Sequence, residues 1–129
     1  LVPHRDEYSE TVCYLVSTMK KKLLYIPDID KWHLWDKDIK EMIKIVDYAL
    51  LDGTFYQDGE LSRDMSKIPH PFVKESMILF KDLSKQNKQK VFFTHLNHTN
   101  PLIIKESKEQ FEVKKLGFNF AMDNLVLEL

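Results

Sequence analysis

The chain has 129 residues, of which 43% are hydrophobic, and its 19 basic side chains almost balance its 20 acidic ones. This length limits the chain to one domain, and the balanced charge argues against a general attraction to nucleic acid or to an anionic membrane. No segment approaches the roughly 18 to 20 apolar residues that a membrane span needs. The single cysteine, Cys13, excludes an internal disulfide framework, and a reducing, cytoplasmic compartment is the simplest interpretation.

The first part of the sequence predicts two strands, a helix and a third strand. Residues 11–17 are rich in β-forming side chains, and residues 23–26 follow a Lys-rich turn, so we expect an antiparallel pair. Apolar residues recur at helical spacing within residues 36–45, with Asp36 as the expected N-cap. Residues 46–51 form a short apolar run that ends in an Asp-Gly pair, which is typical of a buried strand followed by a turn.

The rest of the chain predicts a loop, two helices, a strand and a hairpin. Residues 53–71 contain two of the three glycines and two prolines, which favours a long functional loop. Helical spacing recurs in residues 71–83, and residues 91–94 resemble a buried strand. A last helix and a terminal hairpin are expected at residues 107–116, ended by Gly117, and at residues 118–121 with 125–129. This order predicts an α/β or layered α+β fold, with helices on at least one face of a sheet.

Candidate ligand residues follow the predicted strands, where α/β folds usually place their sites. The run Val-Phe-Phe-Thr ends at His95, and a loop of Asn, His and Thr residues follows at once. Histidine and carboxylate are the ligands expected of a hydrolytic zinc, manganese or iron site, in which the metal activates water. Neither H-E-x-x-H nor a CxxC pair occurs, however, and scattered histidines are usually structural or exposed. Spacing alone therefore does not favour a metal site.

Several motifs in the same order resemble the second half of the metallo-β-lactamase fold, an αβ/βα sandwich of two related halves. Val-Pro-His at residues 2–4 and Leu-Tyr-Ile-Pro-Asp at residues 24–28 resemble the third and fourth motifs of that family, and Phe-Thr-His at residues 93–95 resembles the fifth. Residues 51–55 and 94–101 are similar to the pyrroloquinoline quinone biosynthesis protein B branch, and the expected C-terminal hairpin fits that branch. The resemblance implies that residues 1–129 form a single, partial domain of this sandwich.

The resemblance implies three metal ligands: His4, the bridging carboxylate Asp28, and His95. Each position has a simpler interpretation, namely a histidine near a frayed chain end, an Asp that caps a turn, and a buried structural histidine. One or two divalent ions are the implied cofactors, with zinc favoured over manganese and iron.

Asp52 and His70 are the candidate catalytic pair. In ribonuclease Z, the nuclease branch of this fold, a carboxylate after the corresponding strand pairs with a downstream histidine near the leaving group. A carboxylate that holds a histidine fixes its tautomer and raises its basicity. The alternatives are a turn cap at Asp52 and a plain structural loop around His70.

His98 and Arg5 are weaker candidates for contact with substrate. His98 departs from the quinone-biosynthesis branch, which often has Asn there, and solvent exposure is its favoured interpretation. Arg5 forms a charged cluster with Asp6 and Glu7 that either orders the loop beside His4 or binds an anionic substrate; a surface cluster is the default.

The motif H-x-H-x-D-H, which supplies most of the metal ligands in this fold, does not occur in the sequence. The chain also begins at Leu1 without an initiator Met, and we expect it to be a fragment of a protein more than twice as long. An exposed sheet face would favour association, with the missing N-terminal half-domain or with a second chain, including a homodimer. Alone, the chain is expected to be inactive.

Three functions remain open for the parent protein. The first is a metal-dependent hydrolase, in which metal-activated water attacks a phosphoester, ester or lactam-type bond of a small molecule. The second is an oxidative or accessory step in cofactor assembly, as in pyrroloquinoline quinone biosynthesis. The third is a non-catalytic half-domain that acts through partner association. Asp28 favours the first, because two-metal chemistry needs a bridging carboxylate.

Overall fold

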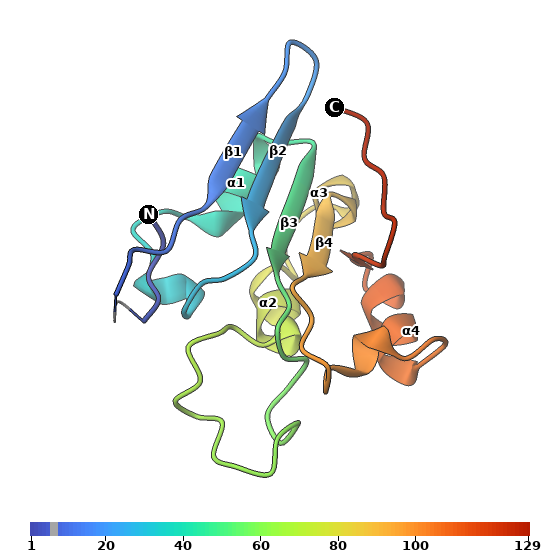
Figure 1. Ribbon diagram of the computed structural model, residues 1–129. Coiled ribbons are helices and arrows are strands. Elements are labelled where there is room, and N and C mark those ends of the chain that lie inside the picture. Colours follow the sequence, from blue (N-terminus) through green and yellow to red (C-terminus); the bar gives the residue numbers. More distant parts are fainter. Residues whose placement is uncertain (6–7) are drawn as a thin grey trace.

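The computed structural model describes residues 1–5 and 8–129, and it contains one five-stranded sheet in the order β1-β2-β3-β4-β5 (Figure 1). The first pair is antiparallel and the other three pairs are parallel. The strands are β1 (Tyr14–Ser17), β2 (Lys22–Ile26), β3 (Tyr48–Asp52), β4 (Val91–Thr94) and β5 (Asn119–Phe120). The helices are α1 (Ile39–Lys44), α2 (Val73–Leu79), α3 (Lys85–Gln89) and α4 (Lys108–Lys115), with short 3-10 turns η1 (Trp32–Leu34) and η2 (Pro101–Ile103). The α/β layering expected from the sequence is confirmed.

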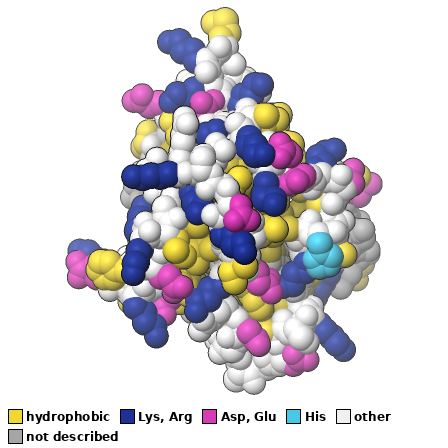
Figure 2. Space-filling model, turned by 180° about the vertical axis from the view of Figure 1, so that it is seen from behind, with side chains coloured by type: hydrophobic (Ala, Val, Ile, Leu, Met, Phe, Trp, Pro, Cys, Tyr) yellow, Lys and Arg dark blue, Asp and Glu magenta, His cyan; other side chains and the backbone are white. Residues whose placement is uncertain are grey.

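Helices cover one face of the sheet. Alternate strand residues point to opposite sides, so every second side chain points toward the helices. Leu24, Leu51 and Phe93 point to the covered face and are fully buried, where they join a core with Ile43 of α1 and Val73 of α2. In Figure 1 the helices α1, α2 and α3 lie behind the sheet. Figure 2 shows this side from behind, with basic and acidic side chains interspersed rather than gathered in a patch of one sign.

The opposite face of the sheet is apolar but only half-buried. Its central residues are Leu23 and Tyr25 of β2, Tyr48 and Leu50 of β3, and Phe92 of β4. No helix packs on this face within the described part of the chain (Figure 1). We call these five residues the open face. A sheet in which both faces are apolar is typical of a strand layer buried on both sides.

The first helix begins later than the sequence predicted. Asp38, not Asp36, is the N-cap, and its side chain accepts a hydrogen bond from the backbone N–H of Lys40 at 2.8 Å. Asp36 is exposed. Within the described residues, its one ion pair is with the neighbouring Lys37. The predicted helix at residues 71–83 is also shorter, because α2 ends at Leu79 and α3 follows as a separate helix.

The expected C-terminal hairpin is wrong. Gly117 adopts a positive φ of 90° and ends α4, and the chain then returns alongside β4 as the parallel strand β5. Phe118 packs against Phe80 and Phe93 in the core, so the apolar segment after Gly117 finds its partners in the existing sheet. Residues 125–129 form no strand.

The parallel strands place the candidate residues at one edge of the sheet. Asp28 follows β2, Asp52 ends β3 and His95 follows β4, and the carboxyl ends of parallel strands meet at the same edge. The loop at residues 53–71 leaves the sheet there as well (Figure 1). Among the described residues, no helix combines the length and apolar character needed to cross a membrane.

Candidate metal centre

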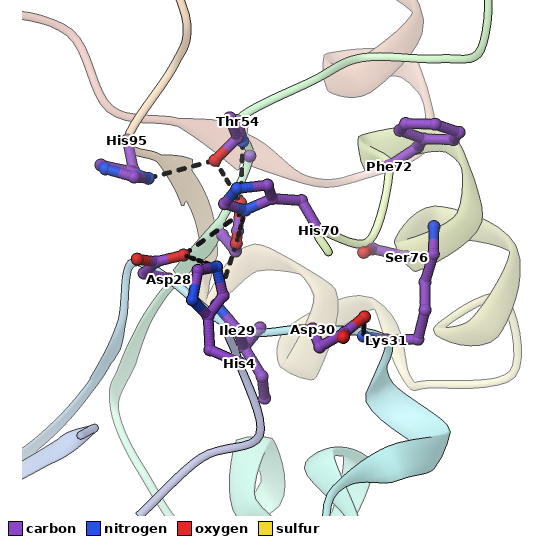
Figure 3. A network of polar contacts seen from close by, with 12 residues as sticks. His4, Asp28, Ile29, Asp30, Lys31, Thr54, His70, Phe72, Ser76 and His95 are labelled. Atoms are coloured by element: carbon purple, nitrogen blue, oxygen red, sulfur yellow. Dashed lines mark hydrogen bonds and ion pairs between the residues drawn. The ribbon is translucent and has the colours of Figure 1, made fainter. Parts of the chain in front are cut away.

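The carboxylate of Asp52 is the most firmly held group of the site. The side chain is fully buried, and its two oxygens have four hydrogen-bond partners (Figure 3). Oδ2 accepts from the backbone N–H of Ile29 at 3.1 Å and lies 2.8 Å from Nδ1 of His70. Oδ1 accepts from the backbone N–H of Thr54 at 2.9 Å and from its hydroxyl at 2.7 Å. A buried, ionised carboxylate is tolerated when donors fill its lone pairs in this way.

His70 reaches this carboxylate from the long loop. It lies between Pro69 and Pro71, which restrict the backbone on both sides. Its ring packs edge-on against Phe55 with 5.9 Å between centroids. Since an ionised carboxylate only accepts hydrogen bonds, Nδ1 of His70 must carry the proton toward Asp52. In the neutral ring, the Nε2 atom then carries the lone pair.

His4 and Asp28 face each other without forming a hydrogen bond. Nε2 of His4 lies 2.9 Å from Oδ1 of Asp28, but both atoms are buried and neither has a hydrogen-bond partner in the described residues. The backbone N–H of Asp30 donates to the carbonyl of Pro3 at 2.7 Å, which holds the two segments together. At 2.9 Å the two atoms form an ion pair when His4 is protonated, and a bound cation is the other arrangement that satisfies both buried atoms.

These two residues and His70 form a group with the dimensions of a cation site. Each offers one ligand atom, and the three atoms lie within 4.8 Å of one another. Ligand bonds of about 2.0–2.2 Å place neighbouring zinc ligands within such a distance of one another. Nδ1 of His70 lies 3.5 Å from Oδ1 of Asp28 but carries the proton toward Asp52, so Nε2 is the atom that His70 could offer to an ion. The residues present therefore fit a divalent ion held by histidine and carboxylate.

His95 stands beside this group. It follows β4 with a positive φ of 60°, and its ring centroid lies 6.4 Å from that of His70. Nδ1 of His95 is 3.1 Å from the hydroxyl of Thr54 (Figure 3). The ring is exposed and borders a cavity of about 330 Å³. The structure thus brings His4, Asp28, Asp52 and His70 together and places His95 at their margin.

The two candidate substrate contacts lie apart from the group. His98 and Arg5 are both exposed, and neither makes a side-chain hydrogen bond or ion pair within the described residues. Asp6 and Glu7, which the sequence grouped with Arg5, lie outside the described residues.

Sequence reasoning gave Thr54 no role. Asn100 is fully buried, and its amide donates to the carbonyl of Gly53 at 2.7 Å, which fixes the turn that carries Asp52 and Thr54. The signal for Thr54 is its place two residues after Asp52, because an Asp side chain often accepts from the backbone N–H two residues on.

The comparisons agree with the fold. A family model described as "Beta-lactamase superfamily domain" matches residues 2–96. Among curated proteins, "Coenzyme PQQ synthesis protein B" of Methylorubrum extorquens strain PA1 is 28% identical over 129 residues, covering 95% of this chain and 42% of that protein. The protein of the same name from Acinetobacter baumannii strain SDF is 25% identical over 137 residues, covering 98% of this chain and 44% of its own length.

A solved structure shares the fold. The crystal structure of Zn(2+)-bound PqqB from Methylobacterium extorquens matches with a TM-score of 0.74 and 27% identity, over 92% of this chain and 41% of that one. The chain thus spans less than half the length of the relatives that it matches.

Proposed function

The chain belongs to the β-lactamase superfamily, with the fold of the PqqB-like second half, and we propose that it supplies metal ligands and a proton-transfer pair to a metal-dependent hydrolase. The observation that carries the proposal is the contact between Nε2 of His4 and Oδ1 of Asp28. Two buried ligand atoms face each other at 2.9 Å without a hydrogen bond, next to a carboxylate-held histidine. A relative of the same fold that is Zn(2+)-bound supports divalent metal binding by the full-length protein.

In this proposal His4, Asp28 and His95 would hold the metal, with Asp28 as the carboxylate ligand. When bound, a divalent ion supplies activation of water and polarisation of the substrate oxygen. Three ligands are fewer than a four-coordinate ion requires. The remaining ligands come from the missing N-terminal half-domain or from a second chain, in keeping with the short span of this chain relative to its relatives.

In this scheme Asp52 and His70 carry out proton transfer to the leaving group. Asp52 fixes the proton of His70 on Nδ1, so Nε2 is the atom that gains and loses a proton. Protonated at Nε2, His70 donates to the leaving group of a phosphoester, ester or lactam-type bond in a small molecule. Arg5 and His98 are kept as candidate substrate contacts, because a partner half-domain or a substrate can approach exposed side chains.

The open face supports the need for a partner layer. Its five apolar side chains are too exposed for a stable isolated surface, and flanking residues of β1 extend the same face, with Tyr14 56% and Val16 45% exposed. We propose that the missing half-domain or a second copy covers it.

Hydrolysis assays on the full-length protein test the proposal. Chromogenic phosphodiester, ester and lactam substrates are offered before chelation, after chelation and after zinc, manganese or iron is restored. We expect at least one substrate to be cleaved only with metal, and His70→Ala to lower kcat by about 100-fold or more. His33→Ala, at an exposed histidine of η1 outside this group, is the matched control and should change kcat little. Cleavage that survives complete metal removal would overturn the proposal of a metal-dependent hydrolase.

The curated relatives favour a second candidate function, an accessory or oxidative step in the assembly of pyrroloquinoline quinone, because their name is "Coenzyme PQQ synthesis protein B". Expression of the full-length protein in a bacterium that lacks its own synthesis protein B distinguishes the two. Restored cofactor production favours this function, and its absence alongside metal-dependent hydrolysis favours the first.

A further inference from the structure

Thr54 connects the buried carboxylate of Asp52 to His95. Its backbone N–H and its hydroxyl both contact Oδ1 of Asp52, at 2.9 and 2.7 Å. The same hydroxyl oxygen lies 3.1 Å from Nδ1 of His95 (Figure 3). One threonine side chain therefore touches both a carboxylate and an imidazole.

The number of protons decides the direction of these hydrogen bonds. A threonine hydroxyl has one proton and two lone pairs, and an ionised carboxylate can only accept. The hydroxyl proton must point to Oδ1 of Asp52. The hydroxyl oxygen then faces His95 with a lone pair, so Nδ1 of His95 must carry a proton to complete the bond. Nε2 of a neutral His95 is consequently unprotonated.

Asp52 orients two histidines by this route. Its Oδ2 lies 2.8 Å from Nδ1 of His70, and its Oδ1 acts on His95 through Thr54. Both rings are held with the proton on Nδ1 and the lone pair on Nε2. A carboxylate commonly orients one metal-binding histidine directly; here the second histidine is reached through a hydroxyl.

The turn that carries Thr54 is rigid enough for this role. The amide of Asn100 donates to the carbonyls of Gly53 and Thr54, at 2.7 and 3.4 Å. The backbone N–H of Asn97, two residues after His95, donates to the carbonyl of Thr54 at 3.0 Å. The loop that bears His95 is thus hydrogen-bonded to Thr54, the residue whose hydroxyl contacts the His95 ring.

We propose that Thr54 is a positioning residue that fixes the Nδ1-protonated tautomer of His95 and so keeps the Nε2 lone pair available to a ligand. The use of that lone pair as a ligand rests on the proposed function, whereas the tautomer itself does not. No covalent step is involved, and Thr54 need not touch substrate.

Nitrogen NMR of the histidine rings tests the inference directly. In the metal-free, ¹⁵N-labelled full-length protein, at a pH where the rings are neutral, long-range ¹H–¹⁵N spectra distinguish protonated from unprotonated ring nitrogens. His95 should be protonated at Nδ1. Thr54→Val keeps the side-chain shape without the hydroxyl and should shift His95 toward the Nε2-protonated form. Thr54→Ser should retain the wild-type tautomer, and His70 should stay Nδ1-protonated in all three proteins.

Metal affinity separates this inference from the proposed function. If His95 is a ligand, Thr54→Val should weaken zinc binding by about 10- to 100-fold and Thr54→Ser should restore it. A changed tautomer with unchanged affinity supports the role of Thr54 and contradicts the assignment of His95 as a ligand. An Nε2-protonated His95 in the wild-type protein overturns the inference even if Thr54→Val does not fold, and so does an unchanged tautomer in a folded Thr54→Val protein.

Discussion

Nδ1 of His70 lies 2.8 Å from Oδ2 of Asp52, which ties the long loop after β3 back to the last residue of that strand. The loop also packs on its own apolar cluster of Phe55, Met65, Ile68 and Phe72, and it brings His70 next to His4, whose ring centroid is 5.3 Å away. The pair therefore connects the rigid sheet to the most irregular part of the site.

Asp52→Asn should destabilise the protein. One oxygen is replaced by an amide that donates, so at least one of the buried donors around it loses its acceptor, at a cost of about 1 to 3 kcal/mol for each. Urea unfolding of the full-length protein measures the loss. The control is Asp82→Asn, an exposed carboxylate whose replacement should stay within about 0.5 kcal/mol of wild type. Equal stabilities of the two variants would contradict the role of Asp52 as a buried acceptor.

Gly53→Ala should disturb the site through the backbone. A Cβ atom there would lie 2.9 Å from Cβ of Phe93 and 3.1 Å from the carbonyl oxygen of Thr94, neither of which can rotate away. We expect a loss of about 1 to 3 kcal/mol in unfolding free energy, together with weaker zinc binding. Gly59→Ala is the comparison, because it meets no atom within 4 Å but has a φ of 80°. It should cost stability through backbone strain and leave zinc affinity unchanged; a similar fall in affinity in both variants would refute the explanation.

Tyr56 predicts a pH dependence of stability at alkaline pH. Burial, and then the hydrogen bond of its hydroxyl to Glu112 at 2.7 Å, raise the pKa of Tyr56. The folded protein therefore keeps the neutral phenol at a pH of about 10, where the tyrosine of the unfolded chain ionises. The contribution of Tyr56 to the unfolding free energy is complete below that pH and is lost as the pH rises further. Unfolding free energies at several pH values from about 8 to 11 should fall less steeply for Tyr56→Phe than for wild type, and identical slopes would count against this prediction.

Leu50 tests whether the open face is covered in the full-length protein. If a second layer packs on it, Leu50→Asp buries an unpaired charge and should lower the unfolding free energy by more than about 2 kcal/mol. Ile45, at 58% exposed, lies outside the open face, and Ile45→Asp is the matched control with a small expected effect. A similarly small effect at Leu50 would mean that the face remains in solvent.

The order of strands and helices along the chain was predictable as far as β4, because apolar runs ending in Asp or His mark buried strands. Residues 91–94 were predicted as a strand with the observed bounds. The contact between His4 and His70 depends on the path of the loop, which the spacing of residues does not encode. The motifs assigned roles to these two histidines only through the family resemblance. The link from Thr54 to His95 depends on one rotamer and one backbone φ, which leave no periodic signal. The C-terminal hairpin failed because local turn chemistry could not show that Phe118 has partners in the core.

The measurement that tests the central claim most directly is the metal content of the full-length protein by inductively coupled plasma mass spectrometry, after loading with zinc and removal of free metal. We predict one or two equivalents in the wild type and in His98→Ala, and loss of at least one equivalent in His4→Ala and in Asp28→Ala. His95→Ala and His70→Ala are measured alongside to show which histidine is the further ligand. Of these two variants, the proposal predicts that only His95→Ala loses zinc. Undiminished zinc in both His4→Ala and Asp28→Ala, with each variant folded, would contradict the metal centre.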